Sequence, residues 1–171
     1  MQRRFQPFRF LLRSAATLAA AVLAAAAWAA PSAHADLAAA SGSEVSGMVK
    51  LVAVPGGASL YVMVVGLKPG IHGFHVHEVG DCSAPDASSA KGHFNPAAKP
   101  HGSHAGDLPD LTADANGVAI LKVDIAAMSL ESGPAGVLNR AFVVHADPDD
   151  HVSQPAGNAG KRIACGVIKA G

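Results

Sequence analysis

The segment of residues 44–65, EVSGMVKLVAV-PGG-ASLYVMVV, decides the class of fold. Its two arms, residues 44–54 and 58–65, are short, apolar and rich in Val, as β-strands are. Between them stands Pro55-Gly56-Gly57, a turn signal that joins two antiparallel strands. The segment therefore predicts a β-hairpin.

Further strand-like runs follow the hairpin. They are residues 73–77 (GFHVH), 117–125 (GVAILKVDI), 141–145 (AFVVH) and 163–168 (IACGVI). After residue 36 no long stretch shows the i, i+3, i+4 apolar recurrence of an amphipathic helix. About seven or eight strands separated by turn signals predict an all-β antiparallel sandwich or barrel. Two segments rich in Gly, Pro, Asp, Ser and His, residues 78–110 and 146–162, are expected to be long loops, which are usually functional.

The N-terminal segment predicts export. Residues 14–30 are almost wholly apolar, and they follow a start that contains four arginines and no acid. Ala33-His34-Ala35 fits the small-x-small cleavage pattern, so we predict a secretory signal peptide over residues 1–35 and one domain over residues 36–171. A transmembrane anchor is the alternative, but the run is short for a membrane span. Arg3-Arg4 leaves both twin-arginine and Sec export open.

Charge and cysteine content exclude several classes of protein. The chain has 13 basic and 13 acidic residues, and removal of residues 1–35 leaves 9 basic against 13 acidic, a net charge of −4. A domain with this negative charge is expected to bind nucleic acid poorly. Two cysteines exclude a disulfide-dense scaffold and a four-cysteine zinc site, although Cys82 and Cys165 can pair in an oxidising compartment.

Eight of the nine histidines lie after residue 35, and six of them fall within residues 72–104. His75 and His77 flank one residue, so on a strand both imidazoles face the same side and form a two-nitrogen site for copper or zinc. Two solvent-facing histidines are the alternative.

A second group of candidate ligands, His101, His104 and Asp107, is spaced by three and three. Two nitrogens and a carboxylate oxygen are usual zinc ligands, although a polar loop would have the same composition. His93 lies in the same loop, and His145 ends a strand. No G-x-S-x-G, P-loop or H-E-x-x-H motif occurs.

Five separated motifs stand out along the chain. They are GFHVHE (73–78), GHFNP (92–96), HAGDL (104–108), FVVH (142–145) and GNAGKRIACGVI (157–168). In this order they resemble the motifs of the copper,zinc superoxide dismutases. The resemblance covers about residues 44–169, and residues 80–85 together with the export signal are similar to bacterial periplasmic members.

The resemblance implies an eight-stranded antiparallel Greek-key barrel that dismutates the superoxide anion to O2 and H2O2. Copper would be held by His75, His77, His93 and His145. Zinc would be held by His93, His101, His104 and Asp107, so that His93 bridges the two metals. Asp149 would hydrogen-bond ligands of both metals, Arg162 would attract superoxide, and Cys82–Cys165 would be a disulfide. Bacterial relatives include monomers and dimers, so a homodimer remains open.

Two intervals are shorter than is usual in the family. Only Gly102 and Ser103 separate the first two zinc-loop histidines, which predicts weaker zinc binding. The segment of residues 150–157 is also shorter than in eukaryotic members.

The competing function is a non-enzymatic copper carrier or metallochaperone on the same fold. A periplasmic metal buffer, with no open position at the metal, is the third.

Overall fold

The computed structural model describes residues 29–171, so most of the predicted signal peptide lies outside the described residues. Within this range the chain forms short strands and long loops, and no helix is long and apolar enough to cross a membrane. The strands are β1 (Ser32–Ala39), β2 (Ser46–Val54), β3 (Gly57–Val65), β4 (Gly70–His72), β5 (Phe74–His77), β6 (Leu111–Ala113), β7 (Ala119–Ala126), β8 (Ala141–His145), β9 (Arg162–Val167) and β10 (Lys169–Ala170).

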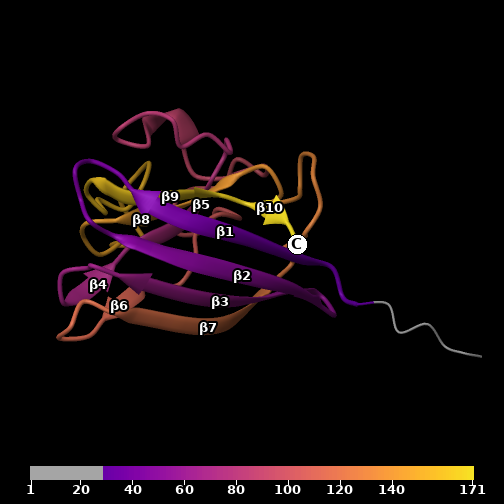
Figure 1. The fold of residues 1–171 in the computed structure, drawn as a ribbon. Helices are drawn as coiled ribbons and strands as arrows, with labels where there is room; N and C mark the ends of the chain where they lie inside the picture. The colour runs from indigo at the N-terminus through magenta and orange to yellow at the C-terminus, as the bar shows by residue number, and fades with distance from the viewer. Residues whose placement is uncertain (1–28) are drawn as a thin grey trace, which may run out of the picture.

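The strands pair in the order β4-β6-β7-β3-β2-β1-β9-β8-β5, and every pair along this path is antiparallel (Figure 1). The two ends of the path, β4 and β5, are separated in the chain by Gly73 alone, so the chain itself nearly closes the barrel. In the same way β10 follows β9 after Ile168, and both pair with β1.

Counted as continuous segments, β4 with β5 and β9 with β10, the described chain has eight barrel strands. The connections from β3 to β4 and from β7 to β8 pass over neighbouring strands, because the strands they join are not adjacent. Such connections are characteristic of a Greek key. The prediction of an all-β, eight-stranded antiparallel Greek-key barrel is therefore confirmed.

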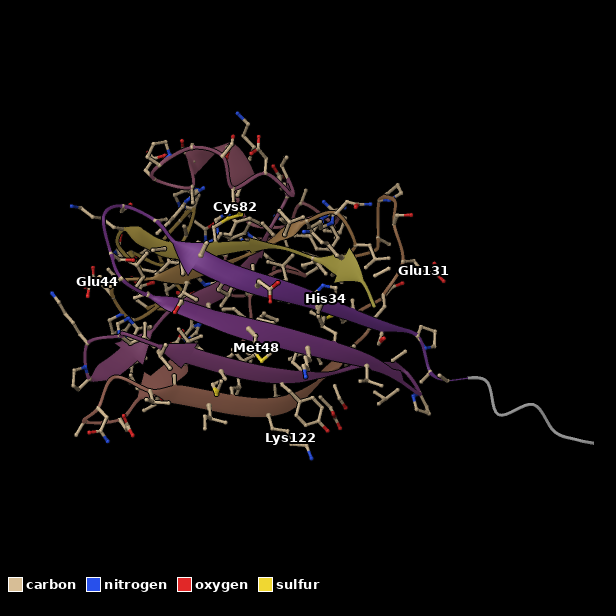
Figure 2. All side chains as sticks on the ribbon, viewed as in Figure 1. His34, Glu44, Met48, Cys82, Lys122 and Glu131 are labelled. Atoms are coloured by element: carbon tan, nitrogen blue, oxygen red, sulfur yellow. A yellow bond between two sulfur atoms is a disulfide. The ribbon has the colours of Figure 1, made fainter. Side chains whose placement is uncertain are left out.

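The barrel core follows from the alternation of side chains along each strand. In β3, Leu60, Val62 and Val64 are buried, whereas Tyr61 and Met63 are exposed. Figure 2 shows Lys122 of β7 pointing away from the barrel. Because aromatic residues are few, the inside is filled mainly by Val, Leu, Ile and Ala, together with the stacked rings of Phe74 and Phe142.

The first long loop, residues 78–110, packs on the outside of the barrel and contains only the short 3-10 helix Ser88–Ala90. Ala87 and Ala90 pack with Val143 of β8 and Cys165 of β9 in a second, small apolar cluster. Cys82 is disulfide-bonded to Cys165, as the resemblance implies, and this bond is visible in Figure 2. The loop is thus fastened to the outer face of β8 and β9.

Five of the predicted strands match β2, β3, β7, β8 and β9 within two residues, and residues 73–77 match β5. Strands β1, β4, β6 and β10 were not predicted. Strands β4, β6 and β10 have only two or three residues, too few to show alternation, whereas the start of β1 was interpreted as a cleavage motif. The expected domain start at Asp36 falls inside β1, which begins at Ser32 and buries Ala33 and Ala35 in the core. The small-x-small motif Ala33-His34-Ala35 is part of this strand.

Candidate metal centre

Strand β5 presents two histidines on the outer face of the barrel. Phe74 and Val76 point into the core, so His75 and His77 face the opposite side, beneath the long loops. Antiparallel pairing places β8 beside β5. On the other side of β8, the pairing with β9 has a register shift between Val144 and His145, after which His145 pairs with Arg162. His93 reaches the same place from the first long loop, where its backbone forms an isolated antiparallel β-bridge with His77.

These residues form the first pocket, which consists of four buried histidines whose ligand atoms lie within 4.8 Å of one another. In each ring one buried nitrogen has no hydrogen-bond partner. A buried polar atom without a partner is costly, and four that converge on one point fit a shared metal ion. The four unpartnered atoms are His75 Nδ1, His77 Nε2, His93 Nε2 and His145 Nε2.

The other nitrogen of each ring is held by the protein. His77 Nδ1 donates to the carbonyl of Lys91 (2.9 Å), and His145 Nδ1 donates to the carbonyl of Gly160 (3.4 Å). His75 Nε2 donates to Asp149 Oδ2 at 2.7 Å. Partners of this kind fix the tautomer and the orientation of a ligand ring.

The second pocket consists of His93, His101, His104 and Asp107. Asp107 Oδ1 lies 2.9 Å from His93 Nδ1, 3.4 Å from His101 Nδ1 and 3.2 Å from His104 Nδ1. Ligands about 2.0–2.1 Å from a tetrahedral ion lie about 3.3 Å apart, so these separations fit zinc. The other carboxylate oxygen, Oδ2, accepts the backbone N–H groups of Gly102 and His104 and so fixes the carboxylate.

His93 belongs to both pockets. Its Nε2 is one of the unpartnered atoms of the first pocket, and its Nδ1 faces Asp107 in the second. Asp149 links the pockets a second time, because Oδ2 accepts from His75 and Oδ1 accepts from His101 Nε2 (2.8 Å). The two pockets are therefore one continuous arrangement of rings and carboxylates.

Burial lowers the pKa of three histidines in the first pocket. The pKa falls to about 4 for His75, about 2 for His77 and about 3 for His145, chiefly because burial disfavours the charged ring. Neutral imidazole is the form that binds metals. For Asp107 burial acts in the opposite direction, but hydrogen bonds from His93 and the His104 backbone outweigh it, so the pKa of Asp107 lies below its usual value.

Comparison with known proteins agrees with this geometry. The family model described as Copper/zinc superoxide dismutase (SODC) matches residues 45–168. The chain belongs to the copper/zinc superoxide dismutase family. A Cu-Zn superoxide dismutase of Aquifex aeolicus is 43% identical over 148 residues, which is 80% of this chain and 86% of the relative. One from Caulobacter vibrioides is 41% identical over 136 residues, covering 72% of this chain and 78% of the relative.

Solved structures show the same similarity. A SOD-like protein from Bacillus subtilis superposes with a TM-score of 0.71 at 34% identity, covering 78% of this chain and 95% of its own. The clock protein EA4 superposes with a TM-score of 0.72 at 36% identity, covering 83% of this chain and 96% of its own.

Arg162 lies at the start of β9, next to the first pocket of this superoxide dismutase family member. Its guanidinium donates to the carbonyls of Ala87 (2.8 Å) and Lys91 (2.6 Å). The Lys91 carbonyl also accepts from His77, so one oxygen connects the arginine to a candidate copper ligand. The disulfide between Cys82 and Cys165 fastens the same loop beside it.

Two residues at the second pocket were not predicted from the sequence, Gln154 and Gly157. Both contact His101, although they lie 53 and 56 positions after it in the chain. Gln154 Oε1 accepts the backbone N–H of His101 at 2.9 Å. A Cβ on Gly157 would meet Asp149 Oδ1 and His101 Nε2. No sequence spacing signals such contacts.

Three histidines of the described chain, His34, His72 and His151, belong to neither pocket. His72 is buried, and its ring lies between the carbonyls of Lys68 and His145.

Proposed function

We propose that this protein dismutates superoxide, converting two superoxide anions and two protons to O2 and H2O2. One observation carries the proposal: the buried ring of His93 has one nitrogen in each of two adjacent pockets. Membership of the copper/zinc superoxide dismutase family supports the same conclusion.

The first pocket fits copper and the second fits zinc. Four imidazole nitrogens from His75, His77, His93 and His145 suit copper, and three nitrogens with the Asp107 carboxylate suit zinc. When bound, copper would supply one-electron redox chemistry. Zinc would supply a positive charge that stays constant, because zinc is not redox-active.

The chain's own residues have distinct parts in this reaction. Arg162 would attract the superoxide anion, because its guanidinium is held beside the first pocket by two carbonyls. Asp149 would keep His75 and His101 in their binding orientations. His93 would hold both metals, and its Nε2 would carry a proton toward the reduced product whenever that atom is free.

We also propose that the protein works in the periplasm. The apolar N-terminal segment supports export, and the disulfide between Cys82 and Cys165 suits an oxidising compartment. Superoxide is the expected substrate, and nothing in the charge of the domain favours a nucleic-acid partner.

A metal analysis combined with a superoxide-consumption assay tests the function. The wild type is expected to hold about one copper and one zinc per chain and to consume superoxide. His77→Ala should lose copper and activity, whereas His34→Ala, on β1 and outside both pockets, should keep both. Copper bound without activity would instead indicate a carrier, and metal bound with no open position at copper would indicate a buffer.

A further inference from the structure

The loop of residues 150–158 contacts the second pocket beside the short interval between His101 and His104. Only two residues separate these histidines, so few neighbouring residues of their own segment are available to hold His101 in position. Three groups of the 150–158 loop meet it. Gln154 Oε1 accepts the His101 N–H at 2.9 Å, the His151 carbonyl lies against Gly102, and Gly157 lies against the His101 ring.

The 150–158 loop is itself closed by Asp150. The Asp150 carboxylate accepts the N–H groups of Val152 (3.0 Å) and Ser153 (2.7 Å) and the side-chain amide of Asn158 (3.1 Å). The backbone N–H of Asp150 donates to the Gly157 carbonyl at 2.9 Å, which brings the two ends of the loop together. The loop therefore presents Gln154 and Gly157 from a fixed frame.

Gly157 is required by space as well as by backbone conformation. Its φ is +63°, which favours glycine, and a Cβ there would lie 1.7 Å from Asp149 Oδ1 and 2.5 Å from His101 Nε2. These two atoms form the hydrogen bond that joins Asp149 to His101. A larger residue would have to displace that bond.

We propose that the 150–158 loop positions His101 for zinc binding, with Gln154 holding the His101 backbone and Gly157 leaving room for the bond between His101 and Asp149. The loop thus compensates for the short interval between His101 and His104. The proposal rests on the zinc pocket of the proposed function, and it assigns Gln154 and Gly157 as positioning residues that touch no metal.

Zinc affinity of Gln154 variants provides the first test. Zinc is titrated against a competing chelator, and Co2+ placed in the second pocket reports ligand geometry through its visible absorption. Gln154→Ala should bind zinc about tenfold more weakly and change the Co2+ spectrum, since partners of ligating residues typically contribute 10–100-fold to metal affinity. Gln154→Glu should restore both, because its carboxylate can accept the same N–H. Val152→Ala is the control, since Val152 lies in the same loop and is 75% exposed.

Alanine substitutions at two glycines provide the second test. They distinguish the steric effect of an added Cβ from the effect of a positive φ, which both glycines have. Gly157→Ala should weaken zinc binding by tenfold or more, whereas Gly42→Ala, with φ +71° and nothing within 4 Å of the added Cβ, should not. Wild-type zinc affinity and an unchanged Co2+ spectrum in Gln154→Ala would overturn the proposal and leave the proposed function intact. A wild-type protein that binds no zinc in this pocket would overturn both.

Discussion

Each histidine of the first pocket that comes from a barrel strand commits one ring nitrogen to the protein and leaves the other free. The partners are the Asp149 carboxylate for His75, the Lys91 carbonyl for His77 and the Gly160 carbonyl for His145. Because these partners lie outside the pocket, the free nitrogens all point inward. Rings arranged in this way need no reorientation to bind a metal.

The histidines of the first pocket predict the pH dependence of the metal-free protein. Burial lowers the pKa of His75 to about 4, of His77 to about 2 and of His145 to about 3. The unfolded chain has these groups near 6.5, so between about pH 4 and pH 6.5 it binds more protons than the folded chain. Stability should therefore rise with pH across this window and be lost as pH falls.

Calorimetry of unfolding in two buffers with different ionisation enthalpies measures this proton uptake. At pH 5 these three rings should contribute about three protons, and His77→Ala should take up about one fewer than the wild type. An uptake that does not change in that variant would contradict the assignment.

Arg162→Ala should keep copper and slow turnover. The guanidinium touches carbonyls and no ligand atom, so its loss removes an attractive charge without removing a ligand. One charge-assisted hydrogen bond to the anion contributes about 1.5–3 kcal/mol, which corresponds to about ten- to a hundredfold in rate. Copper content and superoxide consumption at low ionic strength provide the measurement. Lys169→Ala, exposed on β10, is the control, and a rate equal to wild type in Arg162→Ala would rule out this role.

At the scale of elements, β1 connects the two parts of the barrel. It pairs with β2 over most of its length, and its C-terminal end pairs with β9. Its first half also pairs with β10 and accepts the N–H of Gly171 at the Ser32 carbonyl (2.9 Å). Residues 32–35 are therefore part of the barrel.

A chain that begins at Asp36 should be less stable than one that begins at Ala30. The shorter chain loses the buried methyl groups of Ala33 and Ala35 and several backbone hydrogen bonds of β1. At about 0.8 kcal/mol for each methyl and about 1 kcal/mol for each hydrogen bond, we expect a loss of about 4–6 kcal/mol. Urea unfolding of the two chains measures it.

N-terminal sequencing of the exported protein is the matching observation in cells. We expect the mature chain to begin before Ser32, for which Ala27-Trp28-Ala29 is a small-x-small motif. A mature chain that begins at Asp36 and unfolds at the same urea concentration as the longer one would contradict this expectation.

At the scale of the whole molecule, the disulfide joins two regions that are 83 positions apart in the chain. Closing a loop of that length removes conformational entropy from the unfolded state, which amounts to about 4.6 kcal/mol as an upper figure. Cys82→Ser combined with Cys165→Ser should therefore lower the free energy of unfolding by up to that amount. Denaturant unfolding with metal contents matched measures the change, and a free-thiol assay of the denatured wild type should find none.

The disulfide also bears on the site, because it fastens the loop whose carbonyls hold Arg162 and His77. The double serine variant should thus lose activity at temperatures where it is still folded. Full activity in the folded variant would show that the apolar cluster of Ala87, Ala90 and Val143 is sufficient to hold the loop.

The sequence by itself predicted the hairpin of β2 and β3, the pairing of His75 with His77 on one strand face, and the two long loops. These features are local: alternation determines which side chains share a face, and Gly and Pro determine where strands turn. Through the family motifs the sequence also predicted both sets of candidate ligands, which the structure brings together in two adjoining pockets.

Only the tertiary structure decided how distant parts meet. The pairing of β5 with β8 brings His145 to His75 and His77, and the 150–158 loop brings Gln154 to His101 across 53 positions. It also decided that Ala33 and Ala35 belong to a strand, because their burial depends on β2 and β10 beside them. A local pattern specifies the face of a strand, but the choice of neighbour depends on which contacts the closed barrel makes available.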